Sequence, residues 1–169
     1  MKRVLLLCSC IFTLYSYSQS KTNISLYQDA RLLFVGDDKG NDAFTANILA
    51  KAEFPILTFG ENSLFIYPSA EYADLAGGSF QRYAIGLGYV FDKVFKNIGA
   101  SILADYGNIY RNKRQFSGVS MGSELTYRIN NLMKIGFLYQ YTQRRDLEIM
   151  YDCKDQFILS GFFGVKFYL

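Results

Sequence analysis

The amino-acid sequence predicts an all-β fold, an up-and-down antiparallel β-barrel of about eight strands that follows a cleaved signal peptide. Four observations support this prediction. The chain begins with a short apolar segment, and the rest alternates repeatedly between apolar and polar residues. No later segment reaches the ~18 apolar residues that a membrane-spanning helix requires. Half of the 169 residues are apolar, which argues against a disordered chain.

Residues 1–18 have the features of a secretory signal peptide. Two basic residues precede an uncharged apolar run over 4–15, and Ser16-Tyr17-Ser18 places small residues at the two positions that signal peptidase reads. We expect cleavage after Ser18, with cleavage after Ser20 as the alternative. A barrel domain over residues 19–169 would remain.

The cysteines agree with an exported protein that has no internal disulfide. Cys8 and Cys10 lie in the predicted signal peptide, too early for the lipidated cysteine of a lipoprotein. The mature chain would therefore keep only Cys153, and a single cysteine cannot form an internal bridge.

The period-two alternation predicts the strands. It is clearest on both sides of Asn130-Asn131, a dipeptide that tolerates the dihedral angles of a tight hairpin turn. Pro68 cannot donate a ladder hydrogen bond, so we expect a β-bulge there. The predicted strands are 24–32, 44–54, 64–72, 81–91, 98–106, 118–129, 133–142 and 157–169.

Charge is confined to one face of these strands. Positions of apolar parity carry no charged residue, whereas the opposite parity carries many. The charged residues predicted to face the barrel interior are Asp29, Arg31, Lys51, Glu53, Glu71, Arg82, Asp105, Glu124, Arg128, Lys134, Arg144 and Lys166.

Two architectures produce this alternation. In a membrane barrel the apolar face contacts lipid, whereas in a soluble lipocalin-like barrel it lines a cavity for a small apolar ligand. The apolar face here carries mostly Phe, Tyr, Ile, Leu and Met, which is too much bulk for an eight-stranded lumen. The opposite face is rich in Gly and Ser. We therefore favour a transmembrane barrel and keep the soluble barrel as the alternative.

The alternation continues to the last residue, through Phe163, Val165, Phe167 and Leu169. With this terminal strand, the sequence resembles the small eight-stranded outer-membrane β-barrel proteins of Gram-negative envelopes (the outer membrane protein beta-barrel domain). The resemblance is one of pattern and covers the whole mature chain. The final residue departs from the family pattern, being Leu where the family most often has Phe. The chain also contains no Trp for the aromatic girdles that such barrels place at the two membrane interfaces.

The resemblance implies a location and a set of partners. The protein would lie in the outer membrane with both termini on the periplasmic side, as an even strand number requires. The terminal strand would act as the assembly signal for the barrel-assembly machinery. We expect a monomer whose partners are outer-membrane lipid and, as a candidate, lipopolysaccharide, which Arg111, Lys113 and Arg114 at the outer rim could contact. A merely solvated loop is the simpler interpretation of these three residues.

We do not expect this chain to catalyse a reaction. It contains no histidine, and the known mechanisms of enzymatic lipid hydrolases mostly need a histidine base beside a serine. We therefore predict a non-enzyme without cofactors. The acidic segment over 37–42 has the Asp, Asn and Gly of ordinary turns rather than the spacing of a calcium loop. The near-neutral charge and the lack of a nucleic-acid-binding motif make nucleic acid an improbable partner.

The predicted interior charges carry the functional hypothesis. Buried charges must be paired or solvated, so they would form either a salt-bridged plug or a polar path for small ions. Eight strands are too few for an open aqueous channel. We favour the plug, and with it a structural role in the envelope.

Overall fold

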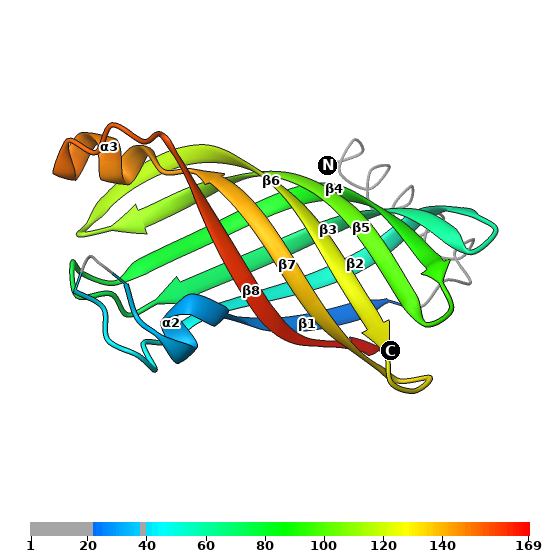
Figure 1. Ribbon diagram of the computed structural model, residues 1–169. Helices are drawn as coiled ribbons and strands as arrows, with labels where there is room; N and C mark the ends of the chain where they lie inside the picture. The colour runs from blue at the N-terminus through cyan, green and yellow to red at the C-terminus, as the bar shows by residue number, and fades with distance from the viewer. Residues whose placement is uncertain (1–21, 38–39) are drawn as a thin grey trace, which may run out of the picture.

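The computed structural model describes residues 22–37 and 40–169 and shows a closed β-barrel (Figure 1). Each strand pairs antiparallel with its neighbours in sequence, and β8 closes the barrel on β1. The strands are β1 (Asn23–Asp29), β2 (Asn47–Phe59), β3 (Asn62–Ala73), β4 (Phe80–Phe95), β5 (Ile98–Arg111), β6 (Arg114–Arg128), β7 (Met133–Gln143) and β8 (Phe157–Tyr168). The predicted signal peptide, residues 1–18, lies outside the described residues.

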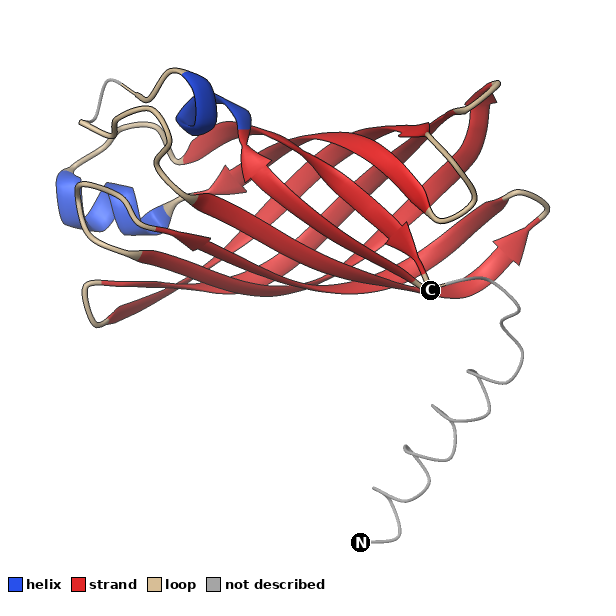
Figure 2. Cartoon of the chain, turned by 90° about the horizontal axis from the view of Figure 1, so that it is seen from below, coloured by secondary structure: helices blue, strands red, loops and turns tan. Residues whose placement is uncertain are grey.

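The barrel has two different ends (Figures 1 and 2). Helices α2 (Ala30–Phe34) and α3 (Arg145–Tyr151) lie at one of them, which we call the loop end. The described chain begins and finishes at the other, the terminus end, where the backbone N–H of Leu169 donates to the carbonyl of Thr22 at 2.9 Å. Within the described residues, no helix is long and apolar enough to cross a membrane.

The two faces of the barrel wall differ as the alternation predicts. Leu125 is 57% exposed, whereas the next residue, Thr126, is 4% exposed. Large apolar side chains cover the outer surface all round the barrel, among them Leu26, Ile48, Ile85, Leu87, Ile102, Met121, Leu125, Tyr139, Leu159 and Phe163. Such a surface is unstable in water and is the surface that lipid requires.

Charge on the outer face should therefore be costly. We expect Leu125→Arg to lower the free energy of unfolding in lipid vesicles by roughly 2–4 kcal/mol, the cost of a cation near the bilayer midplane. Urea titration followed by the folded-band shift on unboiled gels measures this. Glu61→Gln, at an exposed position at the terminus end, is the control and should change little. An equal stability for Leu125→Arg and the native chain would contradict a lipid-facing position.

The first two strands differ from their predicted bounds. The expected strand over 24–32 ends at Asp29, because the Asp29 side chain accepts a hydrogen bond from the backbone N–H of Leu32 and caps helix α2. The expected strand over 44–54 begins at Asn47, after Phe44 at a positive φ of 66°. Local side-chain and backbone conformations end the alternation at these two points.

The bulge predicted at Pro68 is wrong. The ladder between β3 and β4 runs unbroken through the pair of Pro68 and Ile85. The ladder between β2 and β3 lacks the pair of Pro68 and Ala52 and the next pair after it, but the register is the same on both sides of this gap. A residue in an antiparallel sheet directs its N–H and its C=O toward the same neighbouring strand. The missing N–H of Pro68 therefore faces the Ala52 carbonyl. The register shift of this ladder lies elsewhere, between Pro55 and Leu57.

Strands β5 and β6 extend further than predicted, to a two-residue turn at Asn112 and Lys113, both with positive φ. Toward this turn the inward and outward sides of β5 stay the same, but their polarity reverses. Asn108 is on the outward side, and Ile109, on the odd-numbered inward side, is fully buried. It packs in a small apolar cluster with Ala73 and Phe80. The reversed pattern explains why the sequence did not predict this part of the hairpin.

Inside the barrel, aromatic rings pack against glycines. A Cβ at Gly136 would lie 2.5 Å from the Tyr27 hydroxyl oxygen, and a Cβ at Gly86 would lie 2.5 Å from the Tyr67 ring. The glycines of one strand thus leave space for the aromatic side chains of another strand. The interior cluster formed in this way contains Tyr27, Leu49, Phe65, Tyr67, Leu103, Leu138 and Phe162.

Candidate functional site

Four charged side chains meet at the centre of the lumen. We call Lys51, Glu53, Glu124 and Lys166 the central quartet; each is at most 3% exposed. Each lysine Nζ lies 2.9 Å from a carboxylate oxygen of both glutamates, so the quartet is electrically neutral. The Tyr27 hydroxyl also donates to Glu124. Strands β1, β2, β6 and β8 each contribute to this network, which therefore crosses the barrel.

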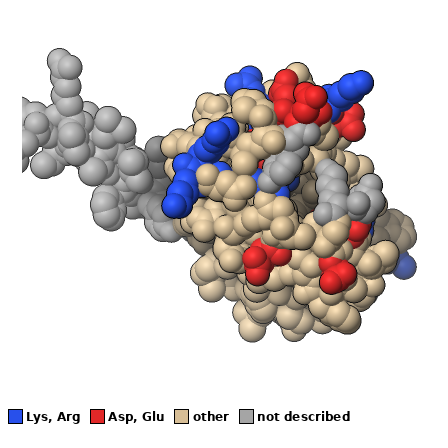
Figure 3. Space-filling view, turned by 90° about the vertical axis from the view of Figure 1, so that its left-hand side faces the viewer, with Lys and Arg blue, Asp and Glu red and all other residues tan. Residues whose placement is uncertain are grey.

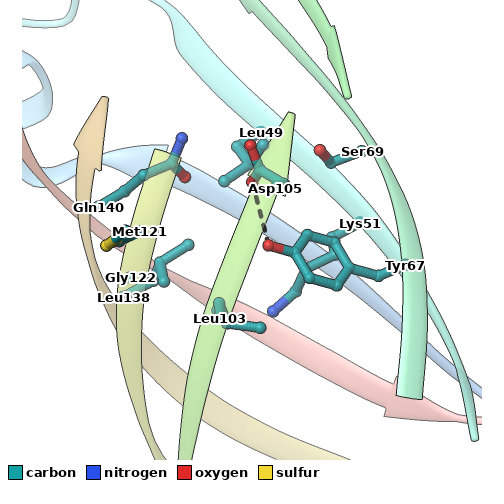
Figure 4. A pocket seen from close by; sticks show the side chains of 10 residues that line it. All are labelled: Leu49, Lys51, Tyr67, Ser69, Leu103, Asp105, Met121, Gly122, Leu138 and Gln140. Atoms are coloured by element: carbon teal, nitrogen blue, oxygen red, sulfur yellow. Dashed lines mark hydrogen bonds between the residues drawn. The ribbon is translucent and has the colours of Figure 1, made fainter. Parts of the chain in front are cut away.

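A second ion pair lies toward the loop end. Arg82 pairs with Asp105, and the Tyr67 hydroxyl donates to the other oxygen of Asp105 at 3.0 Å. Figure 4 shows the Tyr67 ring and the Lys51 side chain directed into the lumen beside this carboxylate. The cavity between them measures about 10 Å³, room for about one water molecule. The lumen is thus filled at this level.

The terminus end of the lumen has its own carboxylate, Asp92. Its two oxygens lie 2.5 Å from Lys134 Nζ and 2.5 Å from an Arg128 nitrogen. Asp92 was not among the predicted interior charges because the expected strand stopped at Phe91. The inward residues of β4, such as Arg82, have even numbers, as Asp92 does. Extending the predicted alternation by one residue would therefore have identified Asp92 as an interior charge.

At the loop end, Asp146 joins two arginines. It accepts two hydrogen bonds of 2.8 Å from Arg144 and lies 3.4 Å from Arg111. Burial alone would raise the pKa of the Asp146 carboxyl, but the hydrogen bonds and charge of Arg144, and then of Arg111, hold that pKa below its ordinary value. Asp146 therefore stays ionised at neutral pH and ties α3 to the barrel rim.

Two predicted placements need correction. Arg31 does not face the interior: its side chain is 60% exposed on helix α2, 3.6 Å from Asp37, because the strand that would have directed it inward ends two residues earlier. Arg111 is not a free rim residue, since it turns inward and is 5% exposed. Of the remaining predicted charges, Asp29 and Glu71 are buried near the loop end.

A larger cavity, the mouth cavity, opens at the loop end and measures about 400 Å³. It is lined by Asp29, Arg31, Leu32, Asp37, Asn41, Asn47, Leu75, Gly77, Arg111, Arg144, Leu147, Cys153, Ile158 and Ser160. Figure 3 looks onto this end and shows basic and acidic side chains around the mouth. Phe80, Gln140 and Phe162 lie with Arg144 and Ser160 around a much smaller cavity of about 10 Å³. The wide part of the lumen therefore ends near the loop end.

The arrangement offers little for metal chemistry. Among the residues that the structure describes, no group of three or more Cys, Asp and Glu side chains is placed to hold a metal ion. The acidic segment over 37–42 is partly outside the described residues. Asp37 there accepts hydrogen bonds from the backbone and side chain of Asn41, which is the bonding of an ordinary turn.

Comparison with known proteins rests on structure. No family model and no curated protein matches the sequence. A designed transmembrane β-barrel is similar with a TM-score of 0.58 and 12% identity, over 90% of this chain and 98% of that chain. The outer membrane protein Ail of Yersinia pestis, in a phospholipid nanodisc, is similar with a TM-score of 0.56 and 13% identity, over 89% and 100%. The crystal structure of Ail gives 0.50 and 14%, over 88% and 95%.

The chain has the fold of the small eight-stranded outer-membrane β-barrels. This finding confirms the predicted fold class. The apolar outer face is the surface that such a membrane-spanning barrel presents to lipid. The low identities mean that the likeness extends to the fold, and the side chains inside this barrel are its own.

Proposed function

We propose that this protein is a closed, structural barrel of the outer membrane, whose lumen is plugged by paired charges and conducts neither solutes nor ions. Both termini lie on the periplasmic side, so the loop end faces outward. The observation that carries the proposal is the central quartet, a neutral network at most 3% exposed that spans the lumen. Interior ion pairs of this kind fix side chains in one arrangement when every member is satisfied.

The interior also argues against transport. A permeating ion would have to displace a lysine or glutamate from contacts of 2.9 Å and then leave that charge without a partner in a desolvated space. The alternative function, a soluble barrel with a small apolar ligand inside, fails on the same observation. The lumen holds charges where such a ligand would need an apolar cavity.

The experiment is a permeability measurement. We expect vesicles containing the refolded protein to release small solutes no faster than empty vesicles, and planar bilayers to show no conductance steps. A sixteen-stranded porin, which leaves an aqueous channel, is the positive control. Reproducible steps that scale with the amount of protein would overturn the plugged lumen.

The structural role has a cellular test. Deleting the gene should raise the sensitivity of cells to detergents and to large antibiotics that an intact outer membrane excludes, and the native chain should reverse this. The partners proposed with this role are outer-membrane lipid, lipopolysaccharide at the outer rim, and the barrel-assembly machinery, with the protein acting as a monomer. Unchanged sensitivity under envelope stress would contradict the structural role and leave the closed lumen standing.

A further inference from the structure

The connection between β1 and β2 carries apolar side chains where the barrel wall has already ended. Phe34, the last residue of α2, is 68% exposed, Val35 is 78% exposed and Phe44 is 82% exposed. We call these three residues the rim patch. They lie beyond the ends of β1 and β2, so the alternation of the strands does not explain them. Exposed apolar groups that gather in one place mark an interaction site.

The members of the rim patch come from neighbouring backbone segments. The backbone N–H of Phe44 donates to the carbonyl oxygen of Leu33 at 3.3 Å, which joins α2 to the segment that leads into β2. Gly36, with a φ of 85°, lies so close to this second segment that a Cβ there would be 2.4 Å from the Asn41 carbonyl oxygen. The three side chains of the rim patch are therefore close together and form one surface.

Polar contacts hold this connection in shape, and the apolar rim patch is left outside. Asp37 accepts hydrogen bonds from the backbone and side chain of Asn41. Asn41 Oδ1 in turn accepts one of 2.7 Å from the backbone N–H of Ala76, in the β3–β4 connection. On α2, Leu32 is buried and lines the mouth cavity. Phe34 follows two residues later in a helix of about 3.6 residues per turn, so it points away from the lumen.

Phe44 is held in a backbone conformation that aromatic residues rarely adopt. Its φ is 66°, in the left-handed region. Among the large apolar side chains that the structure describes, it also has the largest exposed fraction. Backbone strain persists where the surrounding structure fixes it, commonly at functional sites. The connection thus directs an aromatic side chain outward at a cost in free energy, and contact with water does not offset that cost.

The rim patch continues the lipid-facing surface of β2. Ile48 is exposed on that surface and pairs with Tyr72, an exposed residue near the loop end of β3. Outward tyrosines at strand ends are typical of the aromatic girdle at a membrane interface. From Ile48 the chain reaches Phe44 over at most about 14 Å, and the inclination of the strands reduces this to about 10 Å along the membrane normal. Phe44 therefore lies near the level of the lipid headgroups.

We propose that the rim patch inserts into the lipid leaflet at the loop end, and that the β1–β2 connection is a membrane-binding surface. The partner is the boundary between headgroups and acyl chains, which accepts aromatic and aliphatic side chains while the polar backbone around them stays hydrated. A bilayer is the partner that the position favours, because lipid already surrounds the wall of β2 next to the rim patch. This insertion requires the membrane-spanning barrel but not the closed lumen, so a conducting barrel would leave it standing.

Tryptophan fluorescence tests the insertion, because the native chain contains no tryptophan. Phe34→Trp and Phe44→Trp are placed separately in phospholipid nanodiscs, in which a soluble quencher reaches both ends of the barrel. Glu148→Trp, at an exposed position on α3 at the same end, is the control. We expect both rim variants to emit at a shorter wavelength than the control. Nitroxide-labelled lipid should quench them several-fold more than the control, and iodide several-fold less.

Each variant is first checked for a folded band on unboiled gels. If Phe44→Trp does not fold because of its backbone conformation, Phe34→Trp, at an ordinary helical position, decides the result alone. Discs that hold a single barrel separate lipid from a second copy of the chain. A wavelength shift that appears only when two barrels share a disc would assign the rim patch to a dimer and overturn the proposal. Iodide quenching equal to that of the control, without quenching by labelled lipid, would overturn it as well.

Discussion

Glu124→Gln should destabilise the barrel by about 3–5 kcal/mol, the usual cost of removing one partner from a buried ion pair. Glu124 is fully buried and interacts with Lys51, Lys166 and Tyr27. Glutamine keeps the shape but removes the charge, so two buried ammonium groups would share Glu53 alone. Urea unfolding in lipid vesicles measures the loss.

A double variant separates charge balance from packing. Glu124→Gln combined with Lys166→Met restores a neutral interior, so the double variant should be more stable than the sum of the two single effects predicts. Glu61→Gln is the control, because Glu61 pairs with Lys93 at an exposed position, where an ion pair contributes about 0–1 kcal/mol. A loss for Glu124→Gln no larger than that of Glu61→Gln would show that the quartet does not stabilise the barrel.

Deletion of the residues from Phe167 to Leu169 should prevent accumulation in the outer membrane. Phe167 pairs with Ile24 of β1 and with Met133 of β7, so the deletion removes the end of the strand that closes the barrel. It also removes the end of the proposed assembly signal, whose members Phe163, Phe167 and Leu169 are exposed on the outer face. We expect the shortened protein in the periplasm or degraded, as measured by fractionation and immunoblotting.

Refolding in vesicles separates the two consequences of this deletion. A shortened chain that folds in vitro but not in cells has lost the signal, whereas one that fails in both has lost barrel closure. Leu169→Phe is the control, since it restores the family's usual final residue and should leave accumulation unchanged or higher. Normal outer-membrane levels of the shortened protein would contradict both roles of β8.

The sequence predicted the lipid-facing part of the barrel well because the two sides of each strand meet different environments there. Side chains that face the surrounding lipid have to be apolar, whereas side chains that face the narrow lumen have to be small or polar. Toward the loop end this contrast fades, and the inward position 109 holds an apolar residue, Ile109. Alternation could not predict that part of the β5–β6 hairpin.

The candidate site was predictable in composition but not in pairing. Parity alone identifies Lys51 and Glu124 as inward, but their contact joins residues 73 positions apart and depends on how the strands are staggered around the barrel. Arg111 could have been found by continuing the odd-numbered inward series of β5 beyond Asp105. Asp146 had no such signal, because it lies on a helix outside the alternation.

At Pro68 the hydrogen-bonded ladder of the barrel wall has a local gap. The Ala52 carbonyl lies opposite a residue with no N–H to offer, in a part of the wall whose outer surface is apolar. Hydrocarbon cannot satisfy a carbonyl, whereas one water molecule can. Hydration of the wall is therefore favoured at the seam between β2 and β3, and amide protons beside that seam should exchange with solvent sooner than those of the unbroken ladders around it.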